Sequence, residues 1–173
     1  MKHFILLVCL LFSAAVGTTH GQSLDKRFLT HISEAGQLFH IRQQPMSPVR
    51  SCPTRKSLLY DMTHMLGSDS VTFTASFWTA QLLHVPSVRI ERNDGVSTLH
   101  DLQTLYVEPD KQLFKHRIRF VISMDEAKQL FAAPGTFILN FGGGYVYFVS
   151  HKRWGKDSEA VSQIFQLIEL NTK

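Results

Sequence analysis

The chain has few of the residues that build a covalent framework. It contains two cysteines among 173 residues, and Cys9 lies inside an apolar N-terminal run. If that run is removed, Cys52 is the sole thiol and an internal disulfide is excluded. A single exported cysteine is a buried inert thiol, a nucleophile or half of an intermolecular disulfide. Because Cys52 has loop-like neighbours (Ser51, Pro53, Thr54, Arg55), the intermolecular disulfide stays a hypothesis.

Catalytic and metal-binding motifs are also missing. No His-x-x-x-His pair and no Gly-x-Ser-x-Gly elbow occurs, so we expect no metal and no serine nucleophile. The glycines at 142–144 precede an apolar segment without Lys-Ser/Thr, which favours a hairpin turn over a phosphate loop. His100 and Asp101 could activate Cys52 in a thiol enzyme. We therefore expect no cofactor and lean against an enzyme, with this thiol chemistry as an alternative.

The N-terminus has the layout of a secretory signal peptide. Lys2 precedes an apolar run over residues 4–16, and small and polar residues follow. The run is too short to span a bilayer comfortably, since a spanning helix needs about 20 residues. Cleavage fits after Gly21, and Gly17 is the alternative. We expect a secreted or periplasmic protein with no transmembrane helix after cleavage, and Lys26-Arg27 as a less favoured processing site.

Positive charge is modest but clustered. The net charge is +4, of which Lys2 contributes one, and this is far from the density of a dedicated nucleic-acid binder. Lysine and arginine alternate along one expected strand, and a second basic group with an aromatic residue follows the last expected strand. If the two strands are neighbours, they form a basic surface for an anionic ligand; otherwise the charges cover a solvated sheet face. The candidate binding residues are Lys115, Arg117, Arg119, Lys152, Arg153 and Trp154.

The first third of the chain is predicted to be helical. Apolar residues between Leu24 and Gln43 recur every three or four positions, which is typical of an amphipathic helix. Three prolines make residues 44–54 a stiff connector. Leu58 to Leu66 predicts a second helix, which Gly67 would end.

The remainder is predicted to be mainly antiparallel sheet. Alternation predicts strands over 71–77, 88–91 and 113–122, the last forming a hairpin with 105–107. Ser123 and Glu126 form a capping box for a helix over 124–132. A second hairpin spans 136–150, and a C-terminal helix is capped at Asp157 or Ser158. The predicted fold class is α+β: a largely antiparallel sheet with helices at both ends of the chain packed on one face.

These features predict a cleavable signal at residues 1–21 and one domain over 22–173. Within it, residues 22–54 hold the N-terminal helix and connector, and residues 55–173 hold the helix, sheet and C-terminal helix. The leading functional hypothesis is a non-enzymatic secreted or periplasmic binding or assembly protein with a protein partner. Recognition of an anionic polymer or surface (glycan, lipid headgroup or nucleic acid) through the basic residues is the alternative.

Overall fold

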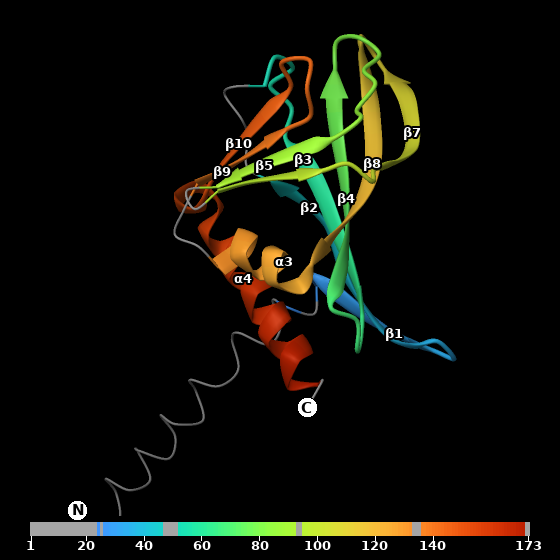
Figure 1. Cartoon of the computed structure of the whole chain (residues 1–173), viewed down its shortest axis with the longest axis vertical. Coiled ribbons are helices and arrows are strands. Elements are labelled where there is room, and N and C mark those ends of the chain that lie inside the picture. Colours follow the sequence, from blue (N-terminus) through green and yellow to red (C-terminus); the bar gives the residue numbers. More distant parts are fainter. Residues whose placement is uncertain (1–23, 25, 47–51, 93–94, 133–135, 172–173) are drawn as a thin grey trace, which may run out of the picture.

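Most of the described chain is antiparallel β-sheet. The structure is a computed structural model that describes residues 24, 26–46, 52–92, 95–132 and 136–171, with the side chains at 132, 136–137 and 148–157 left aside. Six strands pair in the order β1-β2-β3-β4-β8-β7, and four pair as β10-β9-β5-β6 (Figure 1). The first sheet contains β1 (Phe28–Ser33), β2 (Gly36–Met46), β3 (Leu58–Met65), β4 (Ser70–Thr79), β8 (Leu113–Ser123) and β7 (Gln103–Asp110). The second contains β10 (Val146–Ser150), β9 (Thr136–Asn140), β5 (Val88–Arg92) and β6 (Gly95–Leu99).

One face of the six-stranded sheet, called the inner face here, carries the core. The helices α3 (Met124–Ala132) and α4 (His151–Leu170) cover one part of it, where Phe131 contacts both Tyr60 of β3 and Phe165 of α4. The four-stranded sheet covers another part, where Phe141 stacks on Phe77 of β4 at 4.3 Å between ring centroids. The opposite face, called the outer face, holds the side chains that alternate with these core residues.

The predicted helix over 24–43 is wrong, because β1 and β2 form an antiparallel hairpin there. Glu34 and Ala35 connect the strands, and Gly36 has a φ of 124°, which favours glycine. Phe39 and Ile41 point into the core while His40 between them does not, so the period is two. Leu38, on the outer face, is apolar like its inward-facing neighbour Phe39. This adjacent apolar pair made the sequence pattern resemble that of an amphipathic helix.

The second predicted helix, Leu58 to Leu66, is also wrong: these residues form β3 apart from Leu66. Leu58, Tyr60 and Met62 point inward, and outward-facing Leu59 and Met65 hide the alternation from a sequence pattern. The predicted helices over 24–43 and 58–66 therefore do not pack on the sheet, and the helices whose bounds the described residues give, α3 and α4, both follow β8. The coarser prediction of a largely antiparallel α+β fold is confirmed.

The prediction for the C-terminal half is closer to the structure. The capping box of α3 is confirmed, because Glu126 N–H donates to Ser123 Oγ and Ser123 N–H donates to Glu126 Oε2, both at 3.1 Å. The second hairpin is confirmed as β9 and β10, joined through the triple glycine. The C-terminal helix begins earlier than expected, at His151 instead of Asp157 or Ser158, because the chain turns into helix directly after β10.

Candidate functional site

The predicted basic residues of β8 do share one face. Lys115, Arg117 and Arg119 alternate with the buried His116, Ile118 and Phe120, so all three lie on the outer face. Their neighbours across β4 are Trp78, Ser76 and Thr74, and their neighbours across β7 include Glu108, Tyr106 and Gln103. The surface is therefore built from the three adjacent strands β4, β8 and β7.

Lys115 is held by an acidic neighbour. Its Nζ donates to Glu108 Oε1 at 3.0 Å and lies 5.6 Å from the centre of the Tyr106 ring. The hydrogen bond to Glu108 raises the pKa of Lys115 above its usual value. The pair is partly exposed, with 51% of the Glu108 side chain accessible, so water screens it.

Arg117 is held more firmly, by a buried carboxylate. Its Nη2 donates to Asp61 Oδ2 at 2.5 Å, and its Nη1 donates to Ser76 Oγ at 2.9 Å. Only 8% of the Asp61 side chain and 19% of the Arg117 side chain are accessible. This charge-assisted pair links β8 to β3 across β4. Asp61 also neutralises the positive charge of Arg117 that an anionic ligand would need.

A third ion pair at the end of the same sheet was not predicted. Asp110 Oδ2 accepts from Lys56 Nζ at 2.9 Å and from Trp78 Nε1 at 2.6 Å. The hydrogen bond from Lys56 and, to a smaller extent, that from Trp78 hold the pKa of Asp110 below its usual value. Lys56 precedes β3 and Asp110 ends β7, so their sequence separation gave no signal that they meet.

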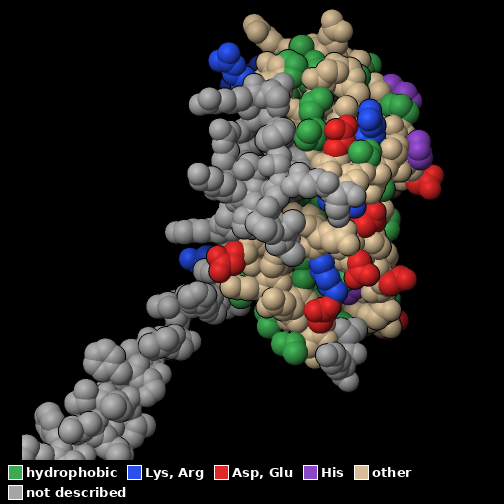
Figure 2. All heavy atoms as spheres, turned by 60° about the vertical axis from the view of Figure 1, so that its left-hand side comes forward, with side chains coloured by type: hydrophobic (Ala, Val, Ile, Leu, Met, Phe, Trp, Pro, Cys, Tyr) green, Lys and Arg blue, Asp and Glu red, His purple; other side chains and the backbone are tan. Residues whose placement is uncertain are grey.

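The two predicted basic groups do not form one surface through paired strands. Lys152, Arg153 and Trp154 belong to the first turns of α4, and their side chains lie outside the description. The preceding strand, β10, belongs to the four-stranded sheet, whereas β8 belongs to the six-stranded one. Arg119 is exposed, with no ion-pair partner among the described residues. On the face in Figure 2, basic side chains are scattered among acidic ones.

Cys52 is buried in the core instead of lying in an exposed loop. It is 1% accessible, and its Sγ lies 3.3 Å from Thr54 Oγ1. The Tyr147 hydroxyl approaches this thiol, and burial raises the pKa of that phenol far above its usual value. In the described part of the chain Cys52 forms no hydrogen bond with a histidine, so His100 and Asp101 are not brought to it. An intermolecular disulfide or a reaction at Cys52 requires this region to open first.

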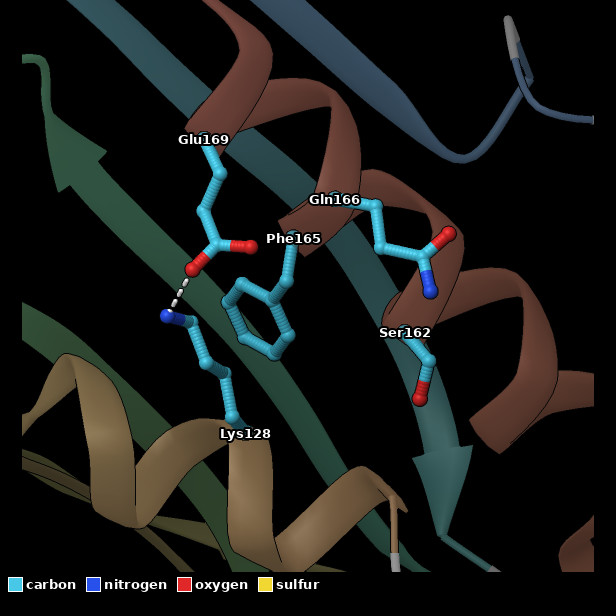
Figure 3. Close-up of a pocket in the computed structure, with 5 residues that line it drawn as sticks. All are labelled: Lys128, Ser162, Phe165, Gln166 and Glu169. Carbon is cyan, nitrogen blue, oxygen red and sulfur yellow. Dashed lines mark hydrogen bonds and ion pairs between the residues drawn. The ribbon is translucent and has the colours of Figure 1, made fainter. Parts of the chain in front are cut away.

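A small pocket lies between α3 and α4. Its volume is about 190 Å³, and Figure 3 shows the Lys128–Glu169 ion pair spanning the helices beside the Phe165 ring. Ser162, which also lines it, donates to the backbone carbonyl of Phe131 at 3.1 Å. Ligand pockets usually exceed about 300 Å³. These contacts therefore hold α3 against α4, and they do not indicate which ligand the pocket would bind.

β1 is exposed, and none of the other described strands pairs with its outer edge. In Figure 1 it projects beyond the sheet, away from α4, and within the described ranges it pairs with β2 alone. Leu29 is 47% and Ile32 78% accessible. Arg42 N–H donates to the Arg27 carbonyl at 2.8 Å, which fixes the alternation of the ladder. The N–H and C=O groups of Phe28, Thr30 and Ile32 therefore point away from β2.

The two edges of the six-stranded sheet are treated differently. β7, at the far edge, carries Pro109, the charged Glu108 and an irregularity in register between Thr104 and Tyr106. Proline, charge and bulges are the devices that prevent an edge from pairing with another chain. The β1 strand FLTHIS has no lysine, arginine, acid or proline, and its ladder with β2 is regular from Phe28 to Ser33.

Comparisons with protein-family models, with curated proteins and with solved structures give no match. No helix in the described part is long and apolar enough to cross a membrane. Among the described residues no cluster of three His, Cys, Asp or Glu side chains could hold a metal ion. The geometry of the chain itself therefore has to support any functional conclusion.

Proposed function

We propose that this chain is a non-enzymatic binding or assembly protein, acting in a secreted or periplasmic setting through protein–protein contacts made by β1. The observation that carries the proposal is the contrast between the two edges of the six-stranded sheet: among the described strands β1 pairs with β2 alone and carries no charge, whereas β7 at the opposite edge carries charge, proline and an irregular register. Export is supported by the signal-like pattern of residues 1–21.

The expected mode of contact is strand addition. An extended segment of the partner would accept and donate main-chain hydrogen bonds at Phe28, Thr30 and Ile32, which gives affinity with little dependence on sequence. Specificity would come from side chains on the two faces, since Leu29 points to the outer face and Ile32 to the inner one. Both are exposed apolar side chains that a partner strand can cover.

The anionic-ligand alternative has weaker support. Lys115 and Arg117 are each paired with a carboxylate, so the described part of the predicted surface leaves Arg119 to supply positive charge. The thiol-enzyme alternative requires access to Cys52, which is 1% accessible. Strand addition needs no rearrangement of the described residues.

The test uses linear peptides displayed on phage and selected on the purified full chain. Thr30→Pro removes an outward N–H without removing a hydrogen bond to β2, and Thr30→Val keeps the N–H as a matched control. We expect selected peptides to bind Thr30→Pro roughly tenfold more weakly, since one lost hydrogen bond amounts to about 1.4 kcal/mol. Binding to Thr30→Val should be unchanged. Equal binding to wild type and Thr30→Pro would contradict the proposal.

A further inference from the structure

We propose that the strand completing the edge of β1 is β1 of a second copy of this chain, so that two six-stranded sheets join across a two-fold axis at Thr30. This inference rests on the proposed function and names its partner. It follows from three properties of β1: the direction of its free main-chain groups, the pattern of its side chains and the charges at its two ends.

The main-chain groups allow the pairing. An axis through Thr30 sets Thr30 opposite Thr30 and Phe28 opposite Ile32 in antiparallel orientation. All of these residues point their N–H and C=O groups outward, so each opposed pair can exchange two hydrogen bonds. An axis perpendicular to the sheet also keeps the inner face of one copy continuous with the inner face of the other.

The side chains select this register. The inner-face residues of β1 are Phe28, Thr30 and Ile32. Phe28 lies opposite Ile41 of β2 and Thr30 lies opposite Phe39, and both of these β2 side chains are buried in the core. With the axis at Thr30, Ile32 of each copy lies opposite Phe28 of the other and its apolar surface is covered. Moving the axis to His31 would set Phe28 opposite Glu34, an apolar group against a charge. The first register is therefore favoured.

The charges flanking β1 favour a second copy over an unrelated extended peptide. Lys26 lies before the strand and Glu34 after it, and both are exposed. In the antiparallel arrangement with its axis at Thr30, Lys26 of each copy comes beside Glu34 of the other. The two-fold symmetry forms this opposite-charge contact twice. A strand that is basic at one end, acidic at the other and uncharged between them is complementary to itself.

Disulfide trapping tests the register in the full chain. In a hydrogen-bonded antiparallel pair the opposed Cα atoms are about 5.5 Å apart, which is within disulfide range. Thr30→Cys should therefore form a covalent dimer under mild oxidation. Ser33→Cys is the matched control, because six residues would separate its two copies by roughly 20 Å. The wild type controls for Cys9 and Cys52.

Sedimentation equilibrium of the same proteins completes the test. We expect the wild type and Thr30→Val to form dimers, and Thr30→Pro to be monomeric with an unchanged circular dichroism spectrum. If Thr30→Pro does not fold, the Thr30→Cys and Ser33→Cys comparison alone decides. Equal linking of the two cysteine variants, a monomeric wild type, or a dimer that persists in folded Thr30→Pro would overturn the inference. In that case, selected peptides whose binding is weakened by Thr30→Pro would still support the proposed function. If no such peptides are found, the proposed function and the dimer are both contradicted.

Discussion

At the scale of single residues, the partners of a charged side chain matter more than its presence. Arg117 was predicted as a ligand-binding residue, yet its guanidinium lies on the buried carboxylate of Asp61. Lys115 faces the more exposed Glu108. When one member of an ion pair is substituted, a buried partner is left as an uncompensated charge away from water, which is costly. An exposed partner is instead hydrated by solvent. The two pairs should therefore respond differently to the same substitution.

We expect Arg117→Met to lower the free energy of unfolding by about 3–5 kcal/mol, because it leaves Asp61 buried and uncompensated. Lys115→Met is the matched control on the same strand face, and it should cost less than about 1 kcal/mol. Urea denaturation monitored by tryptophan fluorescence measures both. Adding Asp61→Asn to Arg117→Met should restore part of the loss. Equal losses for the two single variants would show that burial of Asp61 does not control the effect.

His116 should make stability depend on pH. Thr79 Oγ1 donates its proton to the Gln81 carbonyl at 2.6 Å, so His116 Nε2 donates to Thr79 Oγ1 at 2.7 Å. Burial lowers the pKa of His116, whereas the pKa of a histidine in the unfolded chain is about 6.5. Below the unfolded pKa the unfolded chain binds more protons, so stability falls as the pH falls toward the folded pKa.

His116→Gln keeps a donor for Thr79 and removes the titration. We expect the melting temperature of the wild type to fall more steeply than that of His116→Gln between about pH 7 and pH 5. Differential scanning calorimetry across this range measures the two slopes. His100→Gln serves as a control outside the core, and its slope should follow the wild type. Parallel curves for wild type and His116→Gln would assign the pH dependence to other groups.

At the scale of secondary-structure elements, the β9–β10 hairpin depends on its glycines for two separable reasons. Gly142, Gly143 and Gly144 all have positive φ, at 80°, 60° and 81°. A Cβ at Gly143 would also lie 2.8 Å from Leu83 Cδ1, whereas one at Gly142 would meet nothing within 4 Å. Backbone strain is thus shared by the turn, and the side-chain clash is confined to Gly143.

Gly142→Ala should cost roughly 1–2 kcal/mol of unfolding free energy from backbone strain alone. Gly143→Ala should cost more, because Leu83 has to move as well. Urea denaturation of both variants measures the difference. If Leu83→Ala is added, Gly143→Ala should approach the cost of Gly142→Ala. Identical losses in the two single variants would exclude the contact with Leu83 as a source of strain.

The elements also show where sequence patterns work. The α3 capping box and the β9–β10 hairpin were predicted because their signals lie within a few adjacent residues. β3 was mistaken for a helix because Leu59 and Met65 are apolar on the outer face and hide the period of two. Propensity and periodicity are weak where tertiary packing accepts apolar residues on both faces.

At the scale of the whole molecule, Cys52 reports on opening of the fold. The thiol lies in the core cluster, close to Tyr147 of the second sheet. Reaction with a water-soluble thiol reagent therefore requires separation of these parts, and its rate follows the population of opened molecules.

We expect Ellman's reagent to label Cys52 far more slowly in the native protein than in urea, and this labelling to accelerate as urea destabilises the fold. Cys52→Ser serves as the control, because any remaining reaction then belongs to Cys9. Native labelling as fast as that of a free thiol would show an accessible Cys52 and would revive the intermolecular disulfide. Protection would support a structural role in the core.

The sequence by itself determined features that are local: the strand alternation that puts Lys115, Arg117 and Arg119 on one face, the turn at the triple glycine and the cap of α3. Only the tertiary structure decided which charges meet, because Asp61 and Arg117 approach through pairing of β3, β4 and β8. It also separated β10 from β8 and, within the described ranges, gave β1 no paired strand other than β2. Strand order depends on the packing of distant segments, and no window of neighbouring residues contains that information.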